Sequence, residues 1–386
     1  MAEKITSINN QMLAWARIES NTPLDTAETK FKNIKKWESG EDYPTYAQLR
    51  SLSDYYRKPL AVFFFPEAPK IENIQSSFRT LPENAHSIIN RDVAKIIDWA
   101  RVMQLNLYEL NDNINPSVSK ITDFNFNTAN ISDTAKQLRE LLGSTLSEQK
   151  RIDKLSDAFE YWRDCFYRIG VFVFKEAFKD RTVSGFCIYD SEFPVICINN
   201  SLSASRQIFT LFHEIYHIIH QTGGVDLLDD SILDFQPYDG SEIERNCNRF
   251  AAEFLVPDDD FTNAIKKITV LSDYEIEKLA KMYSVSREVV MRKFLNHGVI
   301  TSAQYEEKRE EYNKEYFRFT GEEQKKGKGG GNYYSTQLTY KGKRYAELAF
   351  NGYYAQKFSI TQLAQYMGMK ISSVQSLASQ KGWGAL

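Results

Sequence analysis

The 386-residue sequence lacks several features that mark particular classes of protein. It has four cysteines, Cys165, Cys187, Cys197 and Cys247, and no Cys-x-x-Cys pair, so neither a disulfide framework nor a zinc ribbon is expected. No uninterrupted apolar run reaches the roughly 18 residues of a transmembrane helix, and the start lacks the apolar core of a signal peptide. We therefore predict a cytoplasmic protein with buried, reduced thiols and no membrane partner.

An excess of either charge sign is also missing. The chain carries 48 Lys plus Arg and 51 Asp plus Glu, which gives a net charge of -3 and a pI near 6.1. A global attraction to nucleic acid or to an anionic membrane is therefore not expected, and any DNA contact has to be local. The length exceeds what a single hydrophobic core usually organises, so we expect several domains.

Histidine is scarce as well, and its distribution is uneven. Of the five histidines, His213, His217 and His220 fall within the segment LFHEIYHIIH. On a helix, His213 and His217 lie one turn apart on the same face, so both imidazoles can reach one metal ion. Glu214 is offset by one position, which places its carboxylate beside the ion, where a general base is needed. A buried helix with hydrogen-bonded histidines is the alternative interpretation.

A zinc site needs a third protein ligand, and a second helical segment offers one. The segment SEIERNCNRFAAEFLVP has a helical period, ends at a proline and begins far enough after His217 for the chain to return. Its Glu244 could instead close a capping box with Ser241, unless Asp239 and Glu242 form the cap. We favour Glu244 as the ligand, and two histidines with a carboxylate suit Zn2+ better than Mn2+ or Fe2+.

The apolar pattern predicts an α+β protein that is mostly helical. The segments DVAKIIDWARVMQLNLYEL and IDKLSDAFEYWRDCFYRIG have the period of amphipathic helices, and the second ends at Gly170. Three segments between residues 171 and 200, VFVF, SGFCIYD and FPVICINN, are rich in β-branched and aromatic residues and predict short strands. The strands thus come directly before the helix that carries His213.

The segment FTLFHEIYHIIH followed by IERNCNRFAAEFLVP resembles the paired signature of the ImmA/IrrE metallopeptidases, and the strands ahead of it are similar too. The resemblance implies a minimal zincin-like domain, with a small sheet and an active-site helix. In it, His213, His217 and Glu244 hold Zn2+, and Glu214 is the general base. The resemblance also implies an edge strand that receives an extended peptide by strand addition, formed by Pro194, Val195, Ile196, Cys197 and Ile198.

Further residues near the motif are candidates for supporting roles. Cleavage of a peptide needs a donor for the developing oxyanion, and metal-bound histidines need hydrogen-bond partners. The sequence does not choose among the candidates for these roles, which are His220, Tyr238, Arg245, Asn248 and Arg249.

The amino-terminal region has a resemblance of its own. Residues 37–67 resemble the closing half of a helix-turn-helix domain of the Cro/CI-repressor-like (XRE) class. The chain before Trp37 is short for the first two helices of such a domain. Lys32, Lys35 and Lys36 form a local basic face that either contacts DNA or is simply solvated.

Together these features predict a chain of consecutive domains. The run EEQKKGKGGGNYY is rich in glycine and lysine, which indicates a flexible linker rather than a phosphate-binding loop. The predicted parts are a degenerate helix-turn-helix domain at 1–70, a helical connector at 71–150, the zincin-like metallopeptidase domain at 151–260, a helical module at 261–320, the flexible linker at 321–334 and a small helical module at 335–386.

We expect the protein to be an intracellular zinc endopeptidase that cuts a protein target. By family analogy the target is a DNA-binding repressor in a stress, mobile-element or defence circuit. The alternative is a regulatory or antitoxin-like protein that binds a partner, such as a toxin or regulator encoded next to it, and uses the metal site as sensor or scaffold. The helical modules on both sides of the motif favour this alternative, because a bare peptidase does not need them. A sequence-specific DNA-binding regulator is the third alternative.

Overall fold

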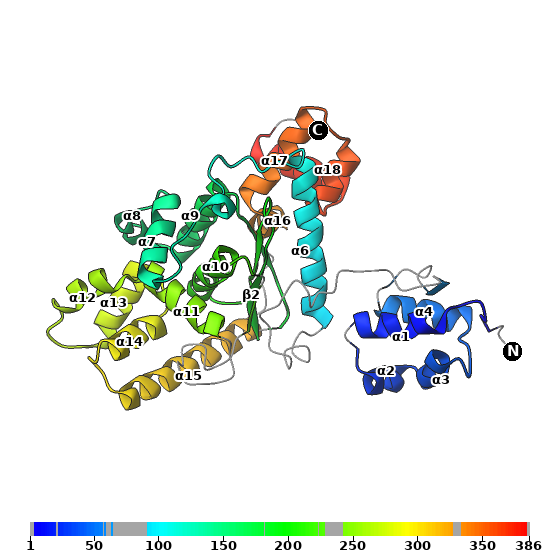
Figure 1. Ribbon diagram of the computed structural model, residues 1–386, viewed down its shortest axis with the longest axis horizontal. Helices are drawn as coiled ribbons and strands as arrows, with labels where there is room; N and C mark the ends of the chain where they lie inside the picture. The colour runs from blue at the N-terminus through cyan, green and yellow to red at the C-terminus, as the bar shows by residue number, and fades with distance from the viewer. Residues whose placement is uncertain are drawn as a thin grey trace. The chain divides into compact units, whose positions relative to one another are not determined.

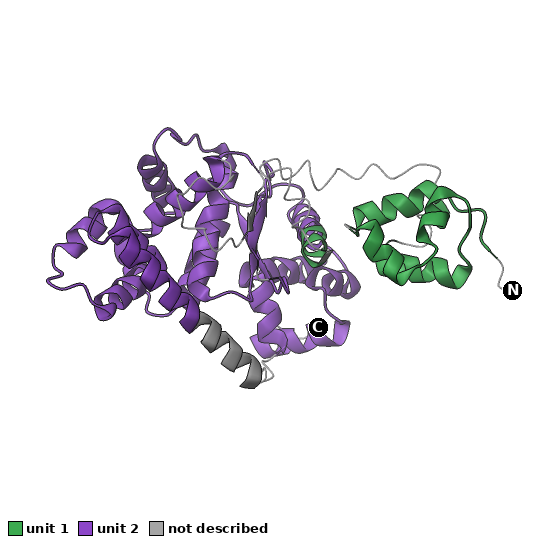
Figure 2. Ribbon diagram, turned by 90° about the horizontal axis from the view of Figure 1, so that it is seen from below, with its two compact units in different colours: residues 1–76, 83–98 green, residues 77–82, 99–386 purple. Residues whose placement is uncertain are grey.

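The computed structural model describes residues 4–20, 22–56, 58, 63–64, 91–180, 182–222, 224–227, 242–326 and 333–383. The chain divides into two compact units, residues 1–76 with 83–98 and residues 77–82 with 99–386 (Figure 2). The division falls within helix α6 (Arg91–Leu110). None of the described helices has the length and apolar character needed to cross a membrane.

In the part of the first unit that is described before α6, four short helices surround a small core of their own. They are α1 (Asn10–Glu19), α2 (Leu24–Lys30), α3 (Ile34–Ser39) and α4 (Tyr46–Tyr56), and Leu13, Ile34 and Leu49 between them are fully buried. Helix α1 begins where the Asn9 side chain accepts a hydrogen bond from the Gln11 amide, and α3 ends at Gly40 with φ of 79°. The chain before Trp37 therefore accommodates two short helices, α1 and α2, and the start of α3, because α2 has only 7 residues.

A sheet of four strands lies at the centre of the second unit. The strands β1 (Phe172–Glu176), β2 (Val183–Ile188), β3 (Val195–Asn199) and β4 (Gly224–Leu227) are arranged in the order β1-β3-β2-β4 (Figure 1). Strand β1 is parallel to β3, and β2 is antiparallel to both β3 and β4. The α+β class and the three predicted strands are confirmed, and β4 is a fourth strand that the sequence patterns did not predict.

The prediction that Pro194, Val195, Ile196, Cys197 and Ile198 form an edge strand is wrong. Strand β3 pairs with β1 on one side and with β2 on the other, and the Pro194 carbonyl accepts a hydrogen bond from the Phe172 amide. Every residue from Val195 to Asn199 is buried. A continuous apolar run is typical of a strand that is covered on both faces, which is the pattern of an interior strand. Among the described residues the outer strands are β1 and β4.

One face of the sheet packs against helices that are its neighbours in the sequence. Val173, Ile196 and Ile198 contact the main core, which includes α9 (Leu155–Arg168), α10 (Ala204–Ile219) and α11 (Glu242–Leu255). In this core the rings of Phe212 and Phe254 stack with centroids 4.1 Å apart. Gly185 of β2 allows α10 to approach, because a Cβ there would lie 2.7 Å from the Thr210 methyl group. All four cysteines are buried thiols, as predicted.

The other face packs against helices from distant parts of the chain. Phe172, Phe174 and Val195 share a second core with α6 from Trp99 onward and with α17 (Lys343–Tyr354), α18 (Ile360–Met367) and α19 (Ile371–Lys381). Helix α16 (Tyr333–Lys341) lies beside β1. The carboxyl-terminal helices are therefore part of the same compact unit as the sheet (Figure 1).

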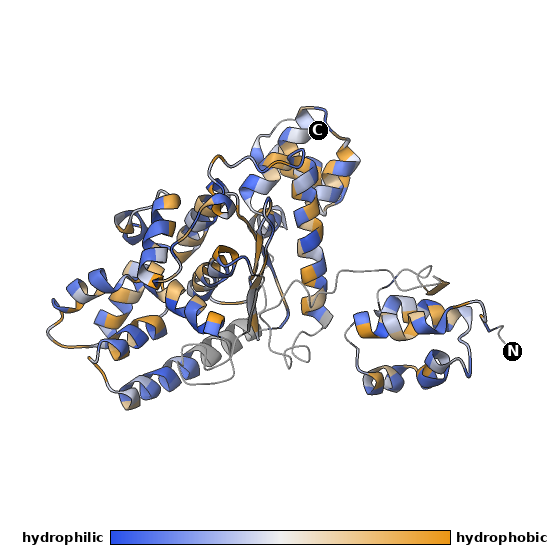
Figure 3. Cartoon of the chain, viewed as in Figure 1, coloured by the Kyte–Doolittle hydropathy of each residue, from blue (hydrophilic) through white to orange (hydrophobic). Residues whose placement is uncertain are grey.

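The remaining helices surround the site side of the unit. They are η3 (Ile121–Asp123), α7 (Ile131–Leu141), α8 (Leu146–Lys150), α12 (Asp258–Ile265), α13 (Asp273–Tyr283), α14 (Arg287–Asn296) and α15 (Ser302–Lys326). The coloured part of α15 is mainly hydrophilic, whereas α10 is largely hydrophobic (Figure 3). The predicted linker at 321–334 is wrong at its start, because residues 322–326 continue α15. Glutamate, glutamine and lysine favour a helix, and after Gly321 the next glycine is Gly327.

Candidate metal centre

Helix α10 places the histidine motif in the interior of the second unit. Its first turn is capped by Ser203, whose side chain accepts a hydrogen bond from the Arg206 amide. Every residue from Gln207 to Ile218 is buried, including the charged or polar side chains His213, Glu214 and His217. A helix that is buried on all sides normally carries few polar groups, so these three need a chemical explanation.

Helix α11 brings Glu244 to both histidines. The Nε2 atom of His213 is 3.1 Å from Glu244 Oε2, and the Nε2 atom of His217 is 3.4 Å from Glu244 Oε1. Burial by itself raises the pKa of a carboxyl group, but the neighbouring imidazoles of His213 and His217 outweigh it and hold the pKa of Glu244 well below its usual range. Glu244 is therefore a carboxylate at neutral pH. The predicted alternative caps, Ser241 and Asp239, lie outside the described residues.

The other nitrogen of each imidazole is held by a hydrogen bond. His213 Nδ1 lies 2.9 Å from Asn248 Oδ1, and His217 Nδ1 lies 3.2 Å from Thr222 Oγ1. The Thr222 hydroxyl donates to the His217 carbonyl at 3.1 Å, so its oxygen is left to accept the Nδ1 proton. Asn248 Oδ1 accepts in the same way. Both histidines are thus fixed in the tautomer whose Nε2 lone pair can bind a metal.

Four side chains offer metal-binding atoms close to one another. One donor atom each from His213, His217, Glu244 and Cys247 lies within 4.8 Å of the other three. Two imidazoles and a carboxylate are a common ligand set for catalytic zinc, so these residues fit the predicted ion. Cys247 was not predicted as a site residue, because the sequence has no Cys-x-x-Cys pair. The sequence feature that marks it is its position three residues after Glu244, on the same face of the helix.

The remaining candidates lie in different places. His220 is half-buried at the end of α10, where its Nδ1 is 3.0 Å from the Tyr216 carbonyl, and burial lowers the pKa of its imidazole. Tyr238 lies outside the described residues. Arg245, Asn248 and Arg249 line a cavity beside α11.

The three lysines of the predicted basic face are at the surface of the first unit. Lys32, Lys35 and Lys36 are exposed, and the Lys35 ammonium lies 2.6 Å from the Glu28 carboxylate. This ion pair offsets part of the local positive charge.

The arrangement defines a class of site. A buried helix carries His-Glu-x-x-His beside a small sheet, and the next helix supplies a glutamate that reaches both histidines, which is the design of a zincin-like metallopeptidase site.

Comparison with known proteins agrees with this class. Residues 167–295, about a third of the chain, match the family model of the IrrE N-terminal-like domain, a peptidase family. The match supports the resemblance to ImmA/IrrE proteins and a metallopeptidase type of function. It does not reach the amino-terminal helices. Comparison with curated proteins finds no similar sequence.

Proposed function

We propose that the protein is a zinc-dependent endopeptidase in which His213, His217 and Glu244 hold the ion. The observation that supports this most directly is the approach of both buried Nε2 atoms to one ionised carboxylate, that of Glu244. The same ligands would accept Mn2+ or Fe2+ less readily. Cys247 lies close enough to take part, and a three-ligand set leaves it beside the ion.

Several residues of the chain have distinct roles in the proposed cleavage reaction. When bound, the ion would polarise the scissile carbonyl group and stabilise the negative charge that develops on its oxygen. Glu214, one position after His213, accepts the proton of the attacking water on its carboxylate and later delivers it to the leaving amine. Burial of Glu214 excludes bulk water from this transfer. Asn248 and Thr222 keep the imidazoles oriented.

An extended substrate segment is proposed to add to strand β4. Among the described residues, β4 pairs only with β2, so its other side offers backbone groups to a peptide. By family analogy the substrate is a DNA-binding repressor. Strand β3 does not contact the substrate in this proposal, because its residues are buried in the sheet.

The test compares wild type with Glu214→Gln and Glu244→Gln on a library of unstructured peptides, with new amino termini identified by mass spectrometry. Wild type should cut, and Glu214→Gln should lose cleavage by several orders of magnitude while keeping its zinc. Glu244→Gln should lose both. Cleavage by Glu214→Gln at the wild-type rate would exclude the mechanism, and stoichiometric zinc in Glu244→Gln would exclude the ligand set.

The separate first unit favours a second candidate function, a regulator that binds a partner protein or DNA. Its four helices have their own core, and Lys32 and Lys36 are exposed on it. In cells, this function predicts that Glu214→Gln replaces wild type fully. For DNA as the partner, binding should weaken steeply with salt, and removing Lys32 and Lys36 together should reduce that salt dependence by about two ions.

A further inference from the structure

The carboxyl-terminal helices, orange to red in Figure 1, contain a helix-turn-helix. Helix α18 is followed by Gly368, whose φ of 57° suits a residue without a side chain, and α19 begins at Ile371. A short turn that contains a glycine is typical of this motif. Helix α17 completes a shared apolar core, in which Phe350 and Trp383 have ring centroids 4.7 Å apart.

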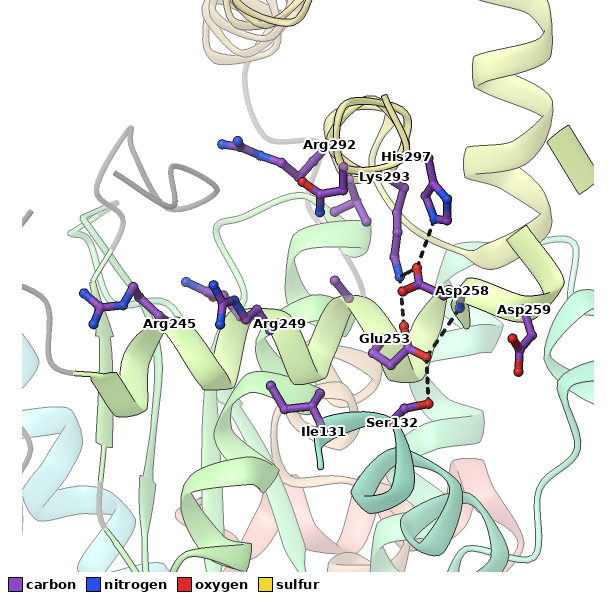
Figure 4. Close-up of a pocket in the computed structure, with 14 residues that line it drawn as sticks. Ile131, Ser132, Arg245, Arg249, Glu253, Asp258, Asp259, Arg292, Lys293 and His297 are labelled. Atoms are coloured by element: carbon purple, nitrogen blue, oxygen red, sulfur yellow. Dashed lines mark hydrogen bonds and ion pairs between the residues drawn. The ribbon is translucent and has the colours of Figure 1, made fainter. Parts of the chain in front are cut away.

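Another pair of helices with a similar connection is covered by its neighbours. Helices α13 and α14 are joined through Ser284, which has φ of 58°, but every residue from Val289 to Phe294 in α14 is buried. Lys293 lies 3.0 Å from Glu253 and 2.6 Å from Asp258, in the network that Figure 4 shows. Helix α14 therefore packs against α11 and α12 inside the unit and is not placed to contact a macromolecule.

Helix α19 differs, because one of its faces is exposed. Val374 and Leu377 belong to the core that α17 and α18 share, whereas Ser372, Gln375 and Ser379, at spacings of three and four, are exposed. Serine and glutamine side chains form hydrogen bonds with base edges, and glutamine pairs with adenine. Ser372 and Gln375 lie in the first half of α19, the part of a recognition helix that contacts bases.

The charge of this end of the chain also differs from that of the whole protein. Residues 335–386 carry six Lys plus Arg and a single acidic residue, Glu347, which gives a net charge of +5, whereas the whole chain has -3. The sequence that forms α18 and α19 contains no Asp or Glu. A positive segment in a protein that is slightly negative overall is suited to a local contact with phosphate groups.

Two lysines lie at the ends of α19. Lys370 precedes the helix and Lys381 is its last residue; both are exposed, and neither is in an ion pair with another described residue. Lys357 differs, because the Asp112 carboxylate lies 2.6 Å from its ammonium group. A helix of 11 residues is about 16 Å long, and the major groove of DNA is about 12 Å wide. Lysines at both ends can therefore reach the two phosphate backbones that border the groove.

We propose that α18 and α19 bind duplex DNA, with α19 in the major groove. Ser372 and Gln375 contact base edges, and Lys370 and Lys381 contact the phosphates on either side. Duplex DNA suits this surface better than a protein partner does, because the exposed face is polar and positive charges lie at its ends. This function belongs to the second unit and depends neither on a metal ion nor on peptidase activity.

Fluorescence anisotropy on the full-length protein, with a labelled duplex of mixed sequence and about 30 base pairs, tests the contact. Wild type is compared with the double variant Lys370→Gln/Lys381→Gln and with the control Lys136→Gln/Lys154→Gln, which removes two exposed lysines elsewhere in the unit. We expect saturable binding by wild type and the control. The α19 variant should lose at least about tenfold in affinity, and the salt dependence of its binding should fall by about two ions.

A second measurement tests whether α19 contacts bases. Selection from a pool of random duplexes gives the preferred sequence of the wild-type protein. Gln375→Ala should then lose about tenfold in affinity for that sequence and bind the mixed-sequence duplex like wild type, because phosphate contacts are unchanged. Equal loss on both duplexes would contradict base contact by Gln375.

Several results would overturn the proposed DNA contact. These are the absence of salt-dependent binding, equal affinities of the α19 double variant and its control, and binding that is lost only when Lys32 and Lys36 of the first unit are replaced. Binding of a single-stranded probe as tight as that of the duplex would exclude a helix in the major groove. Peptide cleavage without DNA binding removes this inference only, whereas DNA binding without a zinc site removes only the proposed function.

Discussion

The two faces of the central sheet are covered in different ways. The face that carries Val173, Ile196 and Ile198 packs against α9 and α10, which flank the strands in the sequence, and the candidate metal centre is built on that side. The face that carries Phe172 and Phe174 packs against α6 and α17–α19, which are distant in the sequence. The comparison teaches that the two faces are covered by different kinds of connection: local connections assemble the candidate site, and long-range packing covers the opposite face of the sheet.

The largest expected effect comes from breaking the distant face. Phe174 is fully buried, and its ring meets Trp99 and Tyr345 at centroid distances of 5.7 and 5.4 Å. Phe174→Ala should lower the free energy of unfolding by about 3–5 kcal/mol, measured by urea denaturation, and leave the zinc affinity of the folded protein unchanged. Phe124→Ala, at a partly exposed ring, is the control. A cost below about 1 kcal/mol would mean that the two halves are not packed as described.

The next largest effect is expected on zinc binding, on the side of the sheet that carries the candidate metal centre. Asn248→Ala removes the acceptor for His213 Nδ1 and should weaken zinc binding by about 10–100-fold, measured by competition with a chelator. Asn246→Ala, two residues away on the same helix, should bind zinc like wild type. Equal affinities for the two variants would show that Asn248 does not orient the ligand.

A smaller effect is expected where α16 meets the sheet. Gly342 has φ of 84°, and a Cβ there would lie 2.8 Å from the Arg163 guanidinium. Gly342→Ala should cost about 1–3 kcal/mol in the free energy of unfolding. Gly143 has φ of 60° with open space around the added Cβ, so Gly143→Ala isolates the backbone cost alone and should be milder. The reverse order would contradict the close approach of Arg163.

The smallest effect is a pH dependence at the edge of the site-side core. Burial raises the pKa of Asp260, but hydrogen bonds from Lys150 and Tyr283 outweigh it, and the pKa is lower than usual. The ion pair therefore stabilises the fold above the unfolded pKa of about 3.9, and its contribution disappears as the pH falls through the folded value. Urea midpoints between pH 2 and 6 should fall less steeply for Asp260→Asn than for wild type. Parallel curves would rule out this contribution.

The residues of the site were largely predictable because helical spacing is a local property. His213 and His217 follow from a spacing of four, and the period of the next helix selected Glu244, which the structure places against both histidines. Thr222 was missed because it reaches His217 through the turn that ends α10, where no repeating pattern exists. Cys247 was not predicted because the sequence has no Cys-x-x-Cys pair, although Cys247 lies three residues after Glu244 on the same helix.

The arrangement of the sheet was less predictable. The strand segments were clear from their composition, but the neighbours of a strand depend on pairing over long separations, so β3 was wrongly placed at an edge. Docking of α17–α19 was also missed, because the amphipathic faces of those helices do not say which surface they cover. The glycine-rich segment suggested a separate module, and a linker of that kind does not prevent its two ends from joining one core.

The hydrogen bonds of Arg163 join segments of the chain that are translated at different times. Its guanidinium donates to the carbonyls of Val173, Thr339 and Tyr340 at 2.8–2.9 Å. Helix α9 is therefore hydrogen-bonded to a segment that is translated long after α10 and α11. Until that segment emerges, Phe172, Phe174 and Val195 are covered only by the part of their core that α6 supplies, so apolar surface stays exposed on the growing chain. The covering of the sheet under the candidate metal centre is thus completed only after α17–α19 have been translated.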